Sequence, residues 1–310
     1  MPELLTVEGI EAKREGTYNV DPSPATSDGV RLARNMWSNL DPDYNWENDR
    51  SNVVNGSLIP PVAALPRGRM AKLELFVEVK GAGSDVPPEA AELLVACGLP
   101  EFDGVSLWTY GPLTTGVKGS CTIYAYTGGL LFKVSGCRGR VRLELVAGEL
   151  AVLHFTMYGI PSADPATTAL AGITYDSTEP IAAVTSTFTI GSWTPDLLSA
   201  TLDLIGKDPE LLASATAADG IQMFDFGDSD PSLDALVRKV PLATYDPYAD
   251  RKARTSRTLV MTLGPAVAFN RLKILGATVQ VMKHPPGDSQ GFVNWSLRWR
   301  ISAGGILQFD

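Results

Sequence analysis

Apolar and polar residues alternate along much of the chain, which is the pattern of a β-strand with one buried face. The clearest run is residues 293–301, where one face carries Val293, Trp295, Leu297, Trp299 and Ile301. In residues 72–80, charged residues separate the apolar positions Leu73, Leu75, Val77 and Val79. Further strands are predicted at residues 30–36, 122–126, 129–139, 141–145, 150–159, 187–190, 199–205 and 257–263. We therefore expect a mainly β protein.

Two segments depart from this alternation and predict short helices. Pro88 suits the first turn of a helix over residues 88–98, Gly98 suits its end, and its apolar face carries Leu93, Leu94 and Cys97. A free cysteine on such a face behaves as a small buried apolar side chain. A second helix is expected at residues 232–239, directly after the turn signal Asp230-Pro231.

Turn-rich segments divide the chain into three parts. Residues 1–65 carry Asp-Pro steps and few periodic apolar residues, which indicates an extended N-terminal arm with the first strand outside the core. A β-rich domain follows at residues 66–165 and contains the helix 88–98. A connector at residues 161–170 leads into a second β-rich half at residues 166–310.

Two ten-residue segments align without a gap and raise the question of an internal repeat. Residues 132–141 and 272–281 share a lysine, a glycine and a final valine, and each is followed by a turn and an alternating strand. A duplication would make the chain two tandem β-domains. Two β-rich halves can also acquire similar endings independently, so both explanations stay open.

The composition restricts the class of protein. The 310 residues carry a formal charge of −9, which argues against a protein that grips nucleic acid through clustered Lys and Arg. We expect no membrane span and no signal peptide, because no apolar window is long enough and the N-terminus lacks the required pattern. Three cysteines without CxxC spacing predict neither a disulfide framework nor a zinc site.

Residues suited to catalysis are sparse. His154 lies on a predicted strand, His284 precedes two prolines, and neither has a partner at the spacing of a triad or a metal site. The acidic turn at residues 225–231 lacks the glycine and the closing glutamate of a calcium loop. We therefore expect no enzyme, no cofactor and no metal.

Assembly with other subunits is the chemistry that remains. Aromatic residues in the arm indicate docking, either against a neighbour or against the subunit's own core. Arginines on the outward faces of strands indicate either complementary patches for neighbours or a solvated surface. The candidate inter-subunit residues are Trp37, Tyr44, Trp46, Arg138, Arg140, Arg142, Arg298 and Arg300.

The order of several motifs resembles the tail tube (major tail) proteins of long-tailed bacteriophages. Residues 17–24, TYNVDPSP, are similar to an early motif of that family, with Asn19 where the family has glycine. Residues 88–99 are similar to its helix ending in Ala-Cys-Gly, and residues 122–159 match its central hairpins. Later landmarks are similar at residues 202–206 and 287–291, whereas residues 211–218 match poorly.

This resemblance implies an antiparallel β-sandwich or barrel with one packed α-helix. It implies a virion structural protein that forms stacked rings around the tape measure protein and contacts the tail terminator and distal tail proteins, while DNA passes through the lumen without specific binding. The ring would be a trimer with pseudo-sixfold symmetry, slightly favoured by the repeat, or a hexamer. Two other classes stay open: a carbohydrate-binding, baseplate- or adhesin-like β-sandwich, and a β-rich hydrolase whose catalytic group is not visible.

Overall fold

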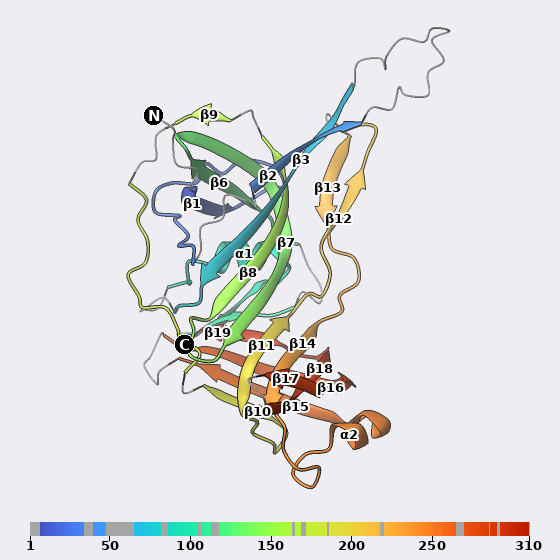
Figure 1. Ribbon diagram of the computed structural model, residues 1–310. Coiled ribbons are helices and arrows are strands. Elements are labelled where there is room, and N and C mark those ends of the chain that lie inside the picture. The colour runs from blue at the N-terminus through green and yellow to red at the C-terminus, as the bar shows by residue number, and fades with distance from the viewer. Residues whose placement is uncertain are drawn as a thin grey trace, which may run out of the picture.

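The computed structural model describes residues 7–33, 40–47, 65–81, 86–104, 107–112, 118–162, 165–168, 172–184, 186–217, 220–264, 270–284, 286–289 and 292–309. Within these residues the fold is mainly β, with antiparallel strands and two short helices, as the alternation predicts. Two β-rich halves lie one above the other in Figure 1, and the long strand β7 (Leu130–Val146) runs from the first toward the second.

The first half is an antiparallel sheet in the strand order β1-β6-β7-β8-β3-β2. Its other strands are β1 (Val7–Arg14), β2 (Leu40–Glu47), β3 (Leu65–Glu78), β6 (Cys121–Thr127) and β8 (Val152–Pro161). The short β9 (Ala166–Thr167) pairs with the start of β7, whereas the hairpin of β4 (Glu101–Gly104) and β5 (Leu107–Tyr110) joins the second half through the pairing of β5 with β19 (Ile306–Phe309). Residues 28–33 close the sheet between β1 and β3, through hydrogen bonds from Ala12 N–H to Asp28 O and from Ala33 N–H to Phe76 O.

The second half has the strand order β10-β15-β16-β18-β14-β11. Its bounds are β10 (Thr187–Ile190), β11 (Leu197–Asp203), β14 (Ser232–Arg238), β15 (Ser256–Leu263), β16 (Leu272–Lys283) and β18 (Phe292–Ala303). Four shorter strands come from the same half of the chain. They are β12 (Glu210–Ala213) and β13 (Ile221–Asp225), which pair with each other, β17 (Pro286–Ser289), which pairs with β18, and β19 (Ile306–Phe309), which pairs with β16.

The two halves connect their strands in the same way. In the first half, β3 leads through helix α1 (Ala91–Ala96) to β6, β7 and β8. In the second half, β14 leads through helix α2 (Pro247–Ala253) to β15, β16 and β18. Each half also starts with a strand that pairs with a strand after its helix, β1 with β6 and β10 with β15. The order of pairing is therefore repeated for these strands, while the β4–β5 hairpin between α1 and β6 and strand β17 between β16 and β18 stand outside the correspondence.

A β-bulge occurs at the same place in both halves. In β7 the register shifts opposite the step from Cys121 to Ile123, and Gly136 takes a φ of +61°. In β16 it shifts opposite the step from Leu259 to Met261, and Gly276 takes a φ of +68°. These are the two glycines that the alignment of residues 132–141 with 272–281 superimposes. Glycine adopts this left-handed conformation without the penalty that other residues incur.

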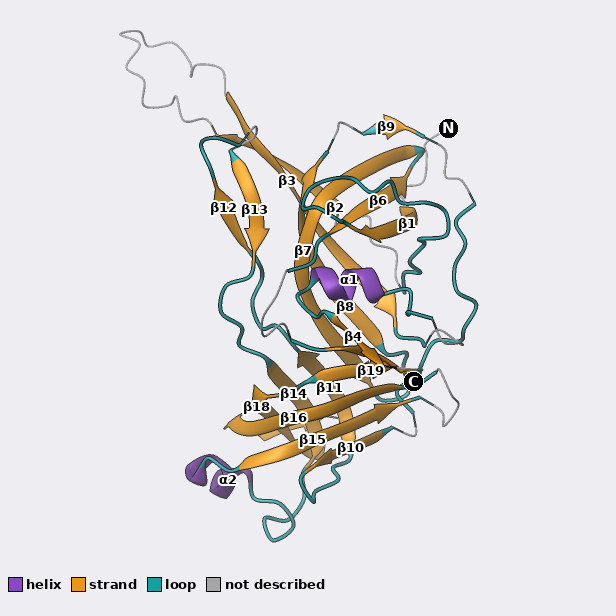
Figure 2. Cartoon of the chain, turned by 180° about the vertical axis from the view of Figure 1, so that it is seen from behind, coloured by secondary structure: helices purple, strands orange, loops and turns teal. Residues whose placement is uncertain are grey.

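Helix α1 packs inside the first half, as its apolar face predicts. Leu93, Leu94 and Cys97 are fully buried, and the helix contacts β1, β6 and β7. Gly98 ends the helix with a φ of +76°. Burial raises the pKa of the Cys97 thiol, so this cysteine behaves as an apolar core residue. Figure 2 shows the helix lying across the inner side of the strands.

The helix expected at residues 232–239 is wrong, because this segment is strand β14. Leu233, Ala235 and Val237 are buried and alternate with more exposed residues, which is the period of a strand. The helix follows instead at α2, where Asp246 caps the first turn by accepting from the N–H groups of Tyr248 and Ala249. An Asp-Pro step precedes both segments, and only the second begins a helix.

The N-terminal segment belongs in part to the core, which corrects the expectation of an arm outside it. β1 pairs with β6 along its length, and Ile10 and Ala12 are buried. Val30 is buried as well, while Leu32 forms a single bridge with Val77 rather than the expected strand over residues 30–36, whose residues 34–36 lie outside the described part. The described part of the segment therefore stabilises the first half.

Candidate functional site at the junction of the halves

The two halves share one sheet. Residues 199–203 of β11 pair antiparallel with residues 142–146 of β7 and on their other side with β14. A continuous run of strands, β2-β3-β8-β7-β11-β14-β18-β16, therefore crosses from the first half into the second. We call this run the shared sheet. Four of its strands come from each half.

An ion-pair cluster fixes the junction on this outward face. The Arg140 guanidinium on β7 donates to the Asp203 carboxylate at the end of β11, at 2.8 Å from Nε, and lies 3.6 Å from the Asp208 carboxylate. Burial lowers the pKa of Arg140, but the hydrogen bonds and charges of the two aspartates outweigh it and raise the pKa overall. Tyr158 donates to Asp208 at 3.0 Å, and burial together with this carboxylate raises the pKa of Tyr158 to about 12.

Arg138 lies two residues before Arg140 on β7 and is buried. This burial corrects the expectation that its side chain faces outward to solvent. Only 6% of the residue is exposed. Its guanidinium donates to the carbonyl oxygens of Lys118, Gly119 and Phe224 and to the carboxylate of Asp225. These contacts attach the base of β13 to the first half, within one chain.

The base of the β12–β13 hairpin is held by further contacts. The N–H of Phe224 donates to the Tyr18 hydroxyl at 2.9 Å, and the Arg138 guanidinium lies over the Tyr18 ring. Burial raises the pKa of Asp225, but hydrogen bonds from Lys118 and the Phe226 N–H, with the charge of Arg138, lower it overall. Strand β13 packs against β7 (Figure 1).

The other predicted arginines lie on the shared sheet, and their side chains become more exposed from Arg142 to Arg298 and Arg300. Arg142 is half-buried, and its Nε has no hydrogen-bond partner among the described residues. Arg298 lies 3.7 Å from Asp234, and Arg300 lies 3.0 Å from Asp230, with all four side chains about half exposed. Exposed pairs of this kind contribute little to folding. The structure brings Arg140 and Arg142 together at the junction and places Arg298 and Arg300 farther along the same face.

The structure describes only part of the aromatic residues of the N-terminal segment. Trp37 lies outside the described residues. Tyr44 and Trp46 lie on β2, an edge strand of the shared sheet that pairs with β3, where the structure describes the backbone alone. Their place on an edge keeps the prediction of an inter-subunit role open.

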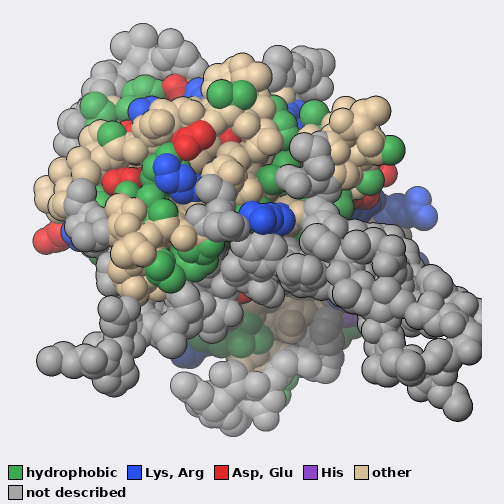
Figure 3. All heavy atoms as spheres, turned by 90° about the horizontal axis from the view of Figure 1, so that it is seen from above, with side chains coloured by type: hydrophobic (Ala, Val, Ile, Leu, Met, Phe, Trp, Pro, Cys, Tyr) green, Lys and Arg blue, Asp and Glu red, His purple; other side chains and the backbone are tan. Residues whose placement is uncertain are grey.

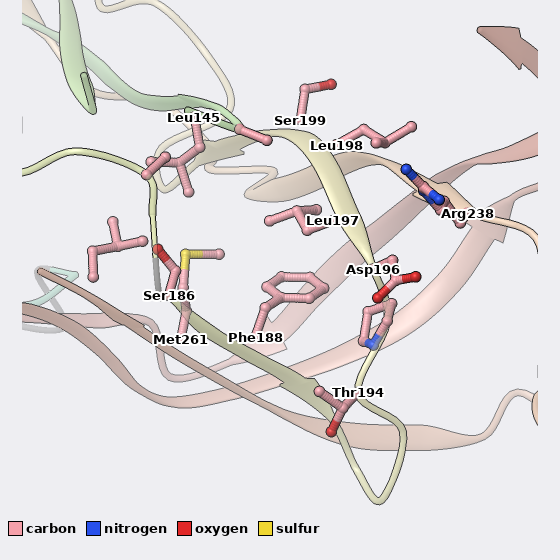
Figure 4. A pocket seen from close by; sticks show the side chains of 14 residues that line it. Leu145, Ser186, Phe188, Thr194, Asp196, Leu197, Leu198, Ser199, Arg238 and Met261 are labelled. Atoms are coloured by element: carbon pink, nitrogen blue, oxygen red, sulfur yellow. The ribbon is translucent and has the colours of Figure 1, made fainter. Parts of the chain in front are cut away.

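A cavity of about 670 Å³ lies beside the junction, between β10 and β11 (Figure 4). Phe188 and Met261 form its apolar wall, Leu145 reaches it from β7, and Asp196 and Arg238 lie at its polar side. In the first half the equivalent seam is closed by residues 28–33 against β1. The second half is open at this seam because β11 pairs with β7 instead.

The histidines and cysteines do not assemble a reaction centre in the described part of the chain. His154 stacks on Phe76 with ring centroids 4.2 Å apart, and its Nδ1 lies 3.0 Å from Glu144. His284 lies at the surface against Tyr248 and Arg251. Within the described ranges, no three His, Cys, Asp or Glu side chains are grouped so that they could hold a metal ion.

The face seen from above carries mixed chemistry. Figure 3 shows Lys, Arg, Asp and Glu side chains scattered singly among apolar and polar ones where described side chains are visible. Neither helix in the described part of the chain has the length and apolar character required to cross a bilayer. No protein-family model matches this chain, and no curated protein matches it either.

Proposed function

We propose that this chain is the building block of a long-tailed phage's tail tube. In this proposal copies join into rings, the rings stack into a tube within the virion, and the tube encloses the tape measure protein and conducts DNA. The observation that carries the proposal is the shared sheet. Two halves of like topology are joined edge to edge by β7 and β11, which is a contact that further copies can continue.

The form of that contact supports ring or tube assembly. The edge of β7 is not the same surface as the edge of β11, so the contact is heterologous, and heterologous contacts produce rings or filaments. Closing the sheet would remove the exposed strand edges that otherwise favour aggregation. A chain with two like halves builds a six-lobed ring from three copies, so we favour a trimer over a hexamer.

The charge of the chain supports a conduit for DNA. The net charge of −9 disfavours tight binding of phosphates, and on the face seen in Figure 3 the Lys and Arg side chains of the described residues lie scattered. A surface that repels or ignores DNA allows it to slide. Contacts with the tail terminator and distal tail proteins at the two ends of the tube belong to the same proposal.

A carbohydrate-binding module is the alternative function, and the described surface supports it less well. Such a module requires neighbouring exposed aromatic rings, whereas Phe102 on β4 and Tyr248 on α2 are the exposed large aromatic side chains of the described residues. They lie on separate elements, a strand and a helix. A binding module would also stay a monomer or a discrete oligomer rather than elongate.

Localisation in phage particles tests the proposal. An antibody against the purified chain, with gold label, is applied to particles produced from the genome that encodes it. We expect label along the length of the tail and a copy number, by quantitative mass spectrometry, that is a multiple of the ring's subunits. Label confined to the tail tip would favour the adhesin-like alternative, and absence from the particle would contradict the proposal.

A further inference from the structure

Strand β10 has a free edge that faces the cavity between β10 and β11. Among the described strands, β10 pairs with β15 alone. Ile190 exchanges both of its backbone hydrogen bonds with Trp193, on the side of β10 that lies away from β15. Phe188 lies two residues earlier and therefore directs its N–H and C=O to that same side. Ser186 and Phe188 both line the cavity, so this backbone edge opens into it.

The free edge of β10 has a counterpart in the first half. Phe188 pairs with Met261, and Ala12 on β1 pairs with Ile123. Met261 and Ile123 each end the step in register that faces a bulge glycine. Phe188 therefore corresponds to Ala12, and the free edge of β10 corresponds to the edge of β1 that lies away from β6.

In the first half this edge is occupied by residues 28–30. The Ala12 N–H donates to Asp28 O, and the Val30 N–H donates to Ile10 O, each at 2.9 Å. The Val30 side chain is buried, with 2% of the residue exposed. The segment thus adds a short strand to β1 and one aliphatic side chain to the core.

The cavity of about 670 Å³ lies where the second half lacks such a strand (Figure 4). Phe188 and Met261 form an apolar wall and are buried. Asp196 and Arg238 line the polar side, are exposed, and have no ion-pair partner among the described residues. Free backbone groups, an apolar wall and charges of both signs are what a sheet edge uses to bind an extended polypeptide.

Exposed apolar side chains flank the mouth of the cavity. Ala147 and Ala183 line it, and the adjacent Val146 and Val184 are 43% and 49% exposed. Leu150, at the other end of the turn between β7 and β8, is 44% exposed. Apolar side chains that gather at the surface mark a place where another molecule binds.

We propose that this seam binds an extended segment of another protein, which adds to β10 as a strand and places one aliphatic side chain in the cavity. Asp196 and Arg238 favour a segment with a basic and an acidic residue beside the aliphatic one. Residues 28–31 of this chain, Asp-Gly-Val-Arg, have that composition. They are held in the first half, so a second folded copy does not supply them. The inference does not depend on the proposed function.

A synthetic peptide tests the site in the full-length protein. The probe is Thr-Ser-Asp-Gly-Val-Arg-Leu-Ala, the sequence of residues 26–33, with blocked ends and a fluorescent label. Anisotropy measures its affinity beside two matched peptides, one N-methylated at the valine amide and one with aspartate in place of valine. We expect saturable binding of the probe. N-methylation should weaken it about tenfold, because it removes the hydrogen bond to Ser186 O, and aspartate should weaken it at least as much.

Variants of the protein locate the bound peptide. Thr194 is exposed and lines the mouth, so Thr194→Trp should block binding. Thr187→Trp is the matched control, since Thr187 is exposed on β10 and does not line the cavity. Circular dichroism confirms that both variants fold. Photo-leucine in place of the peptide's valine should cross-link to residues 186–198 of the protein, which mass spectrometry identifies.

Absence of saturable binding, or equal affinity for the N-methylated peptide, would overturn the proposal. Cross-links confined to residues 7–14 would mean that the peptide displaces residues 28–30 from the first half, and would overturn it too. Self-association of the unmodified chain that Thr194→Trp abolishes and Thr187→Trp leaves intact would identify a second copy as the occupant, contrary to the partner proposed here.

Discussion

Gly136 in β7 and Gly276 in β16 take the same position in two strands from different halves of the chain. Each lies in a bulge where its strand has one more residue than the preceding strand with which it pairs. Each also has a left-handed backbone conformation. A bulge bends the strand and increases its twist. Beyond the bulge, β7 leaves β6 and reaches β11, so this bend positions the junction between the halves.

Replacing either glycine by alanine should destabilise the protein, because a side chain in this conformation costs about 1 to 2 kcal/mol. The added Cβ of Gly136→Ala would also lie 3.0 Å from the Tyr18 ring, whereas at Gly276 it meets no atom within 4 Å. We therefore expect the larger fall in thermal unfolding temperature from Gly136→Ala. Equal melting temperatures for both variants and the unmodified chain would show that the bulges adapt freely.

Replacing Leu94 by aspartate should abolish soluble expression, because the carboxylate would be buried in the core without a partner, at a cost of several kcal/mol. Val184→Asp is the matched control, since Val184 is 49% exposed and should accept the same change. Soluble yield and circular dichroism provide the readout. Normal yield and assembly from Leu94→Asp would mean that α1 does not pack inside the first half.

Arg138 should stabilise the folded chain and Arg300 should not. Arg138→Met removes the guanidinium donor of three carbonyl oxygens and one of the three donors to Asp225, which we expect to cost about 2 to 4 kcal/mol of unfolding free energy. Arg300→Met removes an exposed pair and should change it by less than about 0.5 kcal/mol. Chemical denaturation measures both. Similar values for the two variants would contradict the buried role of Arg138.

Trp46 tests whether the edge strand β2 contributes to assembly. Trp46→Ala should leave the thermal unfolding temperature unchanged and reduce elongation of tubes, if the ring docks against this edge. A collapsed melting temperature would place the side chain in the subunit's own core. Deletion of residues 1–29 cannot make this distinction, because it removes β1 from the sheet of the first half.

Local patterns in the sequence predict the strands well, because alternation reflects which face of a strand is buried. They also locate α1 through Leu94, which is fully buried. The segment after Asp230-Pro231 misled the prediction because a turn signal says that a new element begins and not which kind. Only the period of Leu233, Ala235 and Val237 decides that question.

The candidate site was harder to predict, because it depends on contacts between distant segments. Arg138 has the outward parity of Arg140, but residues 118–119 and the base of β13 cover it. The pairing of β7 with β11 leaves no local signal, since any alternating strand could be the partner. The shared lysine and glycine of residues 132–141 and 272–281 were the one sequence feature that pointed to the equivalent strands.

Self-assembly is the central claim, and electron microscopy of the purified full-length chain tests it most directly. The chain is concentrated without other phage proteins, imaged in negative stain and sorted into class averages. We predict rings or tubes roughly 100 Å wide, as expected for a ring of domains about 30 Å across, with threefold symmetry and six similar lobes. A strictly monomeric protein at high concentration would contradict it.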